Sequence, residues 1–299
     1  MQRVSSFGNF QTLIDHSVKL QADVAQQQIR AGSGKKTDKY SEIADSTKLV
    51  LDLQQDLALS TQYAENANQV MPQLDTMYSS LTQAADILSS FRATLASGFN
   101  GDPNSISGIA VTAQAAQEKM VALLNANVAG NYVFGGTVTD RAPVDMSAYP
   151  VQTYPSSANT SYYGGNDKIL SFTADTDYDV SYGITADNEA FEQALRAMNM
   201  IANLGTYDQN ALQEAYDLTS NAIDANAELL AKTSANATSI DEALDMHTEY
   251  ELFVETLLSD LTDVDAAEAT AEMQALQTQL QASYTALSKS LSMSIMDYL

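Results

Sequence analysis

The feature that most constrains the fold is an apolar seam running from about residue 266 to the end of the sequence. Its side chains recur every three or four residues, at Ala269, Met273, Leu276, Leu280, Tyr284, Leu287, Leu291, Ile295 and Tyr298. The mean spacing of about 3.6 residues keeps the seam on one face of a nearly straight α-helix. Lys289 is the only charged residue between Glu272 and Asp297. Because an exposed helix normally has a charged outer face, we expect this helix to be covered on several sides.

A second helix with a matching stripe is predicted near the start of the chain, over residues 4–29. The loop of residues 31–38 follows it, where Gly32 and Gly34 interrupt the helical pattern. Residues 1–48 have a net charge of +2 and residues 261–299 a net charge of −4. We therefore predict that helices from the two ends pair and form an assembly interface. The predicted interface residues are Val4, Phe7, Phe10, Ile14, Leu20, Val24, Met273, Leu276, Leu280, Tyr284, Leu287, Leu291, Ile295 and Tyr298.

Helical periodicity also fills most of the middle of the chain. The predicted segments are residues 41–97, 103–129, 187–204 and 207–261. Pro72 lies inside the first of them, and it predicts a kink or a short break because proline lacks a backbone donor. Aspartates at the ends of loops are good N-caps. The predicted caps are Asp102, followed by Pro103, then Asp187, and Asp263 or Asp265 for the last helix.

The composition changes abruptly at Gly130. Residues 131–184 hold 9 of the 23 aromatic residues and three of the five prolines, and residues 169–173 and 178–182 alternate as strands do. The predicted fold is mainly α, a long helical bundle or coiled coil formed from both termini with a small β-rich inserted outer domain. The predicted domains are residues 1–44 with 263–299 for assembly, 45–130 with 186–262 as a helical bundle, and 131–185 as the insert. We expect the insert to be removable without loss of the helical part.

The charge balance excludes several classes of function. The chain has 14 basic and 38 acidic residues, a net charge of −24, most of it between residues 49 and 260. So acidic a protein repels nucleic acid and anionic membrane surfaces. Cysteine is absent, which excludes disulfides and thiolate sites. The sequence shows neither a membrane-spanning apolar run nor an apolar signal segment at its start.

A search for chemistry finds no catalytic or cofactor-binding set, so we predict no enzyme and no cofactor. His16 and His247 lie on separate helices among ordinary polar neighbours. The Gly-Ser-Gly-Lys-Lys run at residues 32–36 lacks the spacing of a phosphate-binding loop. Asp175, Asp177 and Asp179 resemble the start of a calcium loop without its glycine and glutamate. They are interpreted as the solvent-exposed face of a β-strand, and whether they bind a cation stays open.

Several segments resemble the bacterial flagellin family. They are MQRVSS at the start, QIRAGSGKK at residues 28–36, LQASYTALS at 280–288 and MSIMDYL at 293–299. NVAGNYVFGGTVTDRAP at residues 127–143 is similar to hook–filament junction proteins, the third hook-associated type. One departure is residues 40–45, where the family often has an Asp-Asp-Pro-like run.

The resemblance implies a non-enzymatic adaptor between the hook side and the filament, exported by the type III route to the extracellular flagellum. Its implied partners are copies of itself in a ring, a hook-side hook-associated protein, flagellin, and an export chaperone that binds the C-terminal region. The implied mechanism is folding of the terminal helices on assembly. Two alternatives remain open: a short flagellin, or a surface module whose acidic insert binds carbohydrate or calcium.

Overall fold

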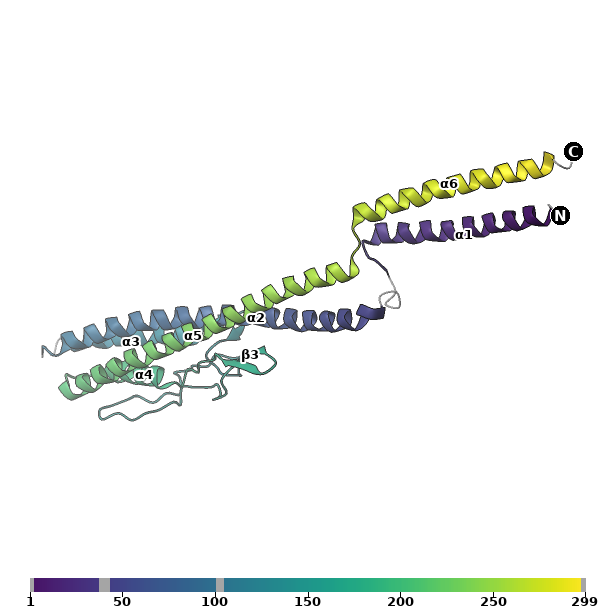
Figure 1. The fold of residues 1–299 in the computed structure, drawn as a ribbon. Coiled ribbons are helices and arrows are strands. Elements are labelled where there is room, and N and C mark those ends of the chain that lie inside the picture. Colours follow the sequence, from purple (N-terminus) through teal and green to yellow (C-terminus); the bar gives the residue numbers. More distant parts are fainter. Residues whose placement is uncertain (1–2, 38–43, 101–104, 297–299) are drawn as a thin grey trace. The chain divides into compact units, whose positions relative to one another are not determined.

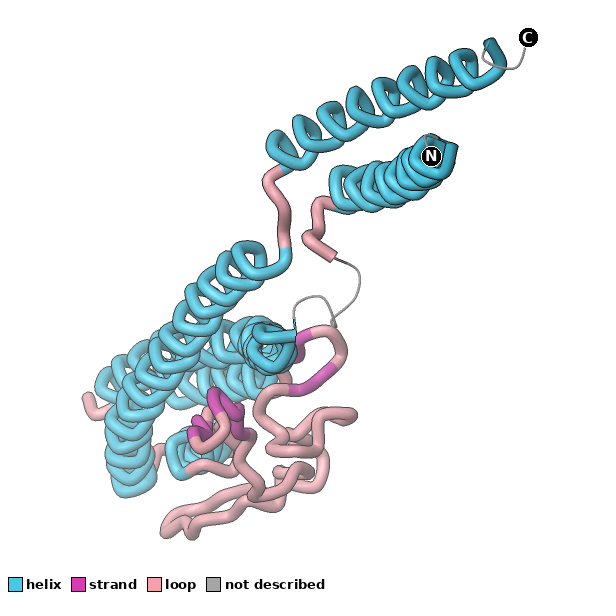
Figure 2. Tube along the Cα trace, turned by 45° about the vertical axis from the view of Figure 1, so that its right-hand side comes forward, coloured by secondary structure: helices cyan, strands magenta, loops and turns pink. Residues whose placement is uncertain are grey.

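The computed structural model describes the backbone of residues 3–37, 44–100 and 105–296. Within these ranges it has six helices and two small antiparallel sheets, which confirms the predicted mainly α fold with a small β region (Figures 1 and 2). The chain divides into two compact units, Met1–Leu59 with Tyr250–Leu299, and Ser60–Glu249. The division into three domains stays a prediction.

The first unit contains helices from both ends of the chain. Helix α1 (Arg3–Ser33) packs along α6 (Ala266–Met296), as Figure 1 shows, so the predicted pairing of the two ends is confirmed. The start of α2 (Ala44–Gly98) and the end of α5 (Gln209–Thr262) belong to the same unit.

The ends of the helices agree partly with the predicted caps. Asp265 caps α6, since its Oδ1 accepts from the backbone N–H of Ala267 at 2.8 Å. Helix α4 (Glu189–Ala202) is capped by Asn188, whose side chain accepts from Ala190 N, so the predicted cap at Asp187 is wrong by one residue. Ser105 precedes α3 (Ile106–Leu124). The expected cap at Asp102 and Pro103 lies outside the described residues.

Helix α2 runs without a break through Pro72, contrary to the expected interruption. Pro72 and Asn68, whose carbonyl would otherwise receive the missing hydrogen bond, are both exposed. Water can replace that bond, and the buried face that contains Leu74 keeps its packing.

The second unit is built around α4, in which every residue from Ala190 to Ile201 is buried. Parts of α2, α3 and α5 surround it, and a buried hydrogen bond of 3.0 Å from the Asn226 amide of α5 to the Leu81 carbonyl of α2 joins two of them. The largest buried side chains of this core include Met77, Leu81, Leu88, Phe91, Leu95, Met120, Leu124, Phe191 and Leu195.

Helix α3 ends at Leu124, earlier than the predicted residue 129. The Asn125 side chain exchanges two hydrogen bonds of 2.9 Å with the backbone of Val144, which holds the chain at the end of the helix. Ala129 and Gly130 then adopt positive φ values of 52° and 87°, as a tight hairpin requires. This hairpin joins β1 (Asn127–Val128) and β2 (Asn131–Tyr132).

The insert has one further hairpin, formed by β3 (Ser171–Asp175) and β4 (Tyr178–Ser181), where strands were predicted. Much of the rest is irregular backbone that packs on the helices. Phe134 and Tyr162 of the insert are buried in the same core as Phe191 of α4. This shared core argues against an insert that can be removed without loss of the helical part.

Candidate assembly surface

The contact between α1 and α6 is a seam that repeats every seven residues. On α1 the partly or fully buried positions include Leu13, Ser17, Leu20, Val24, Gln27 and Ala31. On α6, up to residue 289, they are Ala269, Met273, Leu276, Leu280, Ser283 and Leu287. Alternating steps of three and four residues are typical of coiled-coil packing. Leu20 and Ala269 are buried, but most of the larger apolar members are only half-buried in the single chain.

Polar contacts set the antiparallel register of the pair. The hydroxyls of Ser17 and Ser283 lie 2.7 Å apart inside the seam. Nearer the C-terminal end of α1, Gln27 Nε2 donates to Glu272 Oε2 at 2.6 Å. A shift of one turn would break these contacts, so the polar layer specifies the alignment of the two helices.

Among the predicted interface residues whose side chains the structure describes, all but Tyr284 are buried or half-buried at this seam. Ile14, Leu20 and Val24 on α1 are at least half-buried, as are Met273, Leu276, Leu280 and Leu287 on α6. Tyr284 lies beside the seam and is 42% exposed, and its hydroxyl accepts a hydrogen bond from Gln21. Ser283 occupies the seam position that was predicted for Tyr284. The side chains of Val4, Phe7, Phe10, Leu291 and Ile295 and all of Tyr298 lie outside what the structure describes.

The glycine-lysine loop after α1 runs antiparallel to the segment between α5 and α6. Lys36 N donates to the Thr262 carbonyl at 2.7 Å, and Val264 N donates to the Gly34 carbonyl at 2.9 Å. Gly34 has a φ of 71°, a conformation that favours glycine. The loop therefore ties the two chain ends together.

Two lysine side chains strengthen this tie. Lys35 Nζ lies 2.5 Å from Asp263 Oδ1, and its hydrogen bond holds the pKa of Asp263 below the usual value of 3.8, with Thr262 contributing. Lys36 Nζ donates to the carbonyl of Asp260 at 2.5 Å, near the end of α5, where a cation is favourable. Sequence reasoning excluded a phosphate-binding loop here but did not predict the tie, because its partners lie over 200 residues away.

Helix α1 carries a second apolar stripe on the side away from α6. Val18 and Ile29 are 59% and 56% exposed, and Ala22 and Ala25 between them are exposed too. The spacing of four, three and four residues aligns these side chains on one face. The outer surface of α6 likewise has small exposed residues, at Ala271, Ala275 and Ala282.

A groove of about 420 Å³ lies beside the seam, lined by residues of both helices that include Asp23 and Glu272. Gln27 Oε1 and Arg30 Nε are buried there without a hydrogen-bond partner among the described residues. Buried polar atoms are normally paired, and these two are exceptions.

The histidines have no catalytic arrangement in the described chain. His16 is exposed. His247 is buried, with Nε2 2.7 Å from the Ala174 carbonyl oxygen and Nδ1 3.0 Å from the Ser60 hydroxyl. A carbonyl can only accept, so Nε2 carries a proton and donates to Ala174. His247 therefore ties β3 and α2 to α5.

No group of three or more acidic or histidine side chains within the described residues could hold a metal ion. Asp175, Asp177 and Asp179 are exposed, as predicted, but they do not share one strand face, because Asp175 ends β3, Asp177 lies in the turn and Asp179 belongs to β4. None of the described helices is both long and apolar enough to cross a membrane.

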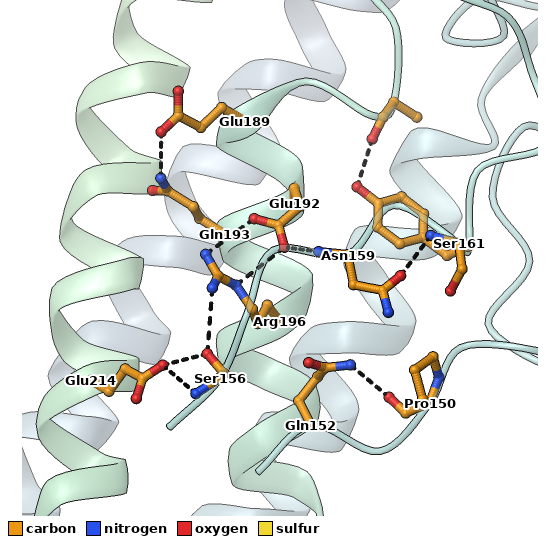
Figure 3. Close-up of polar contacts among 12 residues, drawn as sticks. Pro150, Gln152, Ser156, Asn159, Ser161, Glu189, Glu192, Gln193, Arg196 and Glu214 are labelled. Carbon is orange, nitrogen blue, oxygen red and sulfur yellow. Dashed lines mark hydrogen bonds and ion pairs between the residues drawn. The ribbon is translucent and has the colours of Figure 1, made fainter. Parts of the chain in front are cut away.

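A buried polar cluster fixes part of the insert to the helices (Figure 3). Arg196 Nη2 donates to Glu192 Oε2 at 3.2 Å, and Asn159 N donates to Glu192 Oε1 at 2.9 Å. Ser156 N donates to Glu214 of α5 at 2.9 Å. Burial, with a smaller contribution from the Glu192 charge, raises the pKa of Tyr149 to about 12. These contacts pair the charged side chains of Glu192 and Arg196 and attach the insert segment from Ser156 to Asn159 to α4 and α5.

The fold and the surface define a helical protein whose two ends pair and whose middle carries an insert. Residues 240–299 match the bacterial flagellin C-terminal helical region. A protein of Vibrio parahaemolyticus, assigned as a flagellar hook-associated protein, has a similar structure: TM-score 0.61 at 17% identity, over 74% of this chain and 100% of that one. Xanthomonas campestris FlgL has a TM-score of 0.56 at 17% identity, over 69% and 99% of the two chains. No curated protein sequence matches the chain.

These findings confirm the predicted resemblance to flagellins and to hook-associated proteins. The sequence match covers the end of α5 and all of α6. At 17% identity the two solved structures show a shared fold.

Proposed function

We propose that this chain is a non-enzymatic structural subunit of the bacterial flagellum that joins the hook side to the filament. The match of residues 240–299 to flagellins and the fold shared with hook-associated proteins support a flagellar role. The similarity of residues 127–143 to junction proteins favours this position over that of a filament subunit.

The observation that carries the proposal is the two-sided apolar character of α1. Its inner stripe packs on α6, while Val18 and Ile29 on the outer side stay more than half exposed. Burying an exposed aliphatic side chain contributes about 1.5–3 kcal/mol. Neighbouring copies that covered the outer stripe would complete the burial that a single chain leaves unfinished.

The unpaired atoms of the groove beside the seam support the same proposal. Arg30 Nε needs an acceptor and Gln27 Oε1 needs a donor. In the proposed ring the two side chains turn so that these buried atoms become accessible, and a neighbouring copy supplies both partners. The terminal helices become fully ordered on assembly, because only then is every face of α1 and α6 covered.

The proposed partners are further copies of the chain, a hook-side hook-associated protein and flagellin, with an export chaperone that holds the C-terminal region before assembly. The proposed route is type III export, and the proposed site is the extracellular hook–filament junction. The outer stripe of α1 forms the proposed contact surface, while the predicted interface residues that lie in the seam hold α1 on α6.

Val18→Asp tests the proposal, with Val111→Asp as a matched control. Val111 is 69% exposed on α3, so both variants replace an exposed helical valine by aspartate. In a strain without its own copy, we expect Val18→Asp to be exported but to leave the cells without filaments, and Val111→Asp to restore motility. Normal filaments with Val18→Asp would refute the role of the outer stripe.

Antibody labelling of intact flagella tests the position. Label confined to the base of the filament supports the junction role. Label along the whole filament would instead identify a short flagellin, which has the same kind of terminal helices.

A further inference from the structure

A hollow on the surface of the second unit has the composition of a sugar-binding site. It measures about 320 Å³ and lies between Tyr154 of the insert and the first turns of α5. Its α5 wall consists of Asn210, Gln213, Glu214, Asp217, Leu218 and Asn221. This volume is at the lower end of the range for small-molecule sites.

The loop that carries Tyr154 is held in place by the buried cluster of Figure 3. Two residues further on, Ser156 donates both its backbone N–H and its hydroxyl to Glu214. The Ser156 hydroxyl also accepts from Arg196 Nη1 at 3.4 Å. The aromatic ring of Tyr154 is therefore mounted on an anchored segment, yet it is 47% exposed.

The walls of the hollow offer hydrogen-bonding groups that the fold does not use. Gln213 Nε2 donates to Asp217 Oδ1 at 2.9 Å, which leaves Asp217 Oδ2 available. The side-chain amides of Asn210 and Asn221 find no partner among the described residues. An amide can donate twice and accept twice, so it suits vicinal hydroxyls.

We propose that this hollow binds one neutral sugar residue, a hexose or an N-acetylhexosamine. The apolar C–H face of the sugar ring lies on the Tyr154 ring, whose face is electron-rich and apolar. The hydroxyl rim reaches the amides of Asn210 and Asn221 and the Asp217 carboxylate. Glu214 and Asp217 make the walls negative and the lining has no basic residue, so acidic sugars are repelled. This inference is independent of the flagellar role.

Saturation-transfer NMR on the full chain tests the proposal, with N-acetylglucosamine and methyl β-galactoside as neutral probes and N-acetylneuraminic acid as the acidic one. We expect at least one neutral probe to receive saturation at millimolar concentration, with a Kd of about 1–10 mM, and the acidic probe to receive none. Tyr154→Ala and Asn221→Ala should each weaken binding about tenfold, and Tyr154→Phe should retain it. Tyr178→Ala is the control, because Tyr178 is 51% exposed on the β3–β4 hairpin, away from the hollow's lining.

Several results would overturn the assignment. They are no transfer to either neutral probe at about 20 mM, equal transfer to the acidic probe, or unchanged binding in Tyr154→Ala. Loss of binding in Tyr154→Phe would also overturn it, because the ring and not the hydroxyl is assigned to the sugar face. Binding of oligolysine without any sugar would assign the hollow to a basic peptide instead.

Discussion

Phe134→Ala should destabilise the helices of the second unit, although Phe134 belongs to the insert. The side chain is fully buried in the core, with its ring edge-to-face on Phe191 of α4 at 5.8 Å between centroids. Truncation of a buried phenylalanine costs about 3–5 kcal/mol. The aromatic pair accounts for about 0.5–1.5 kcal/mol of interaction beyond the buried area. The backbone bond from Ala186 N to the Phe134 carbonyl, 2.9 Å long, is kept in the variant.

Urea unfolding followed by far-UV circular dichroism measures the effect, since the signal comes mainly from the helices. With a slope of about 2 kcal/mol per molar urea, the midpoint should fall by about 1.5–2.5 M. Tyr178→Ala, at an exposed site on the hairpin, should leave it unchanged. If Phe134→Ala does not fold, Phe134→Leu should still show a smaller fall, about 1 kcal/mol in stability.

An unchanged helical midpoint in both Phe134 variants would refute the reasoning. It would mean that the insert folds as a separate domain, as its composition first suggested. Removal of residues 131–185 would then be harmless, whereas the shared core predicts that it uncovers the apolar surface of α4.

Three further predictions concern the contacts between distant parts of the chain. Leu287→Asp places a charge in the half-buried seam, so it should lower the hydrogen-exchange protection of α1 in the single chain by about tenfold or more; equal protection would mean that the pair forms only on assembly. The lowered pKa of Asp263 means that the tie to Lys35 contributes its full stabilisation above pH 3.8 and is lost as the pH falls through the lowered value. An NMR titration of the Val264 amide follows this step, and Lys35→Met should move the step to higher pH. His247→Phe removes the imidazole donor to the buried Ala174 carbonyl, while Ser60 keeps its bond to the backbone carbonyl of residue 247. Thermal unfolding should therefore show a loss of about 1–3 kcal/mol in the free energy of unfolding.

The sequence predicted the helices well because their apolar periodicity is a local property. The ends of α1, α5 and α6 fall within a few residues of the predicted positions. The seam was harder to predict, since a count of apolar residues selects Tyr284 over Ser283. Ser283 takes the inner position because its hydroxyl meets that of Ser17, a contact no local pattern can reveal.

The position of the insert in the sequence could be predicted from its composition, but the way it packs on the helices could not. Periodicity predicted the β3–β4 hairpin, whereas the irregular loops have no repeat from which to predict packing. The Asn125 side chain, just after α3, donates to the Val144 carbonyl, and the Glu192 carboxylate of α4 accepts from the backbone N–H of Asn159. Side chains on or next to helices therefore hold these loops in place. Such long-range polar contacts decide that the insert shares the helical core.

The scarcity of charge near the C-terminus first indicated a helix covered on several sides, and the structure extends that reasoning to α1. A helix with apolar residues on two opposite faces leaves apolar surface in water unless both faces are covered. Helix α6 covers the face that contains Leu20, while the face that contains Val18 and Ile29 is exposed. The antiparallel pair is therefore incomplete as a single chain, and its polar seam contacts fix the register in which it presents the uncovered stripe. A surface with fixed register and uncovered apolar side chains is what an ordered assembly of many copies requires.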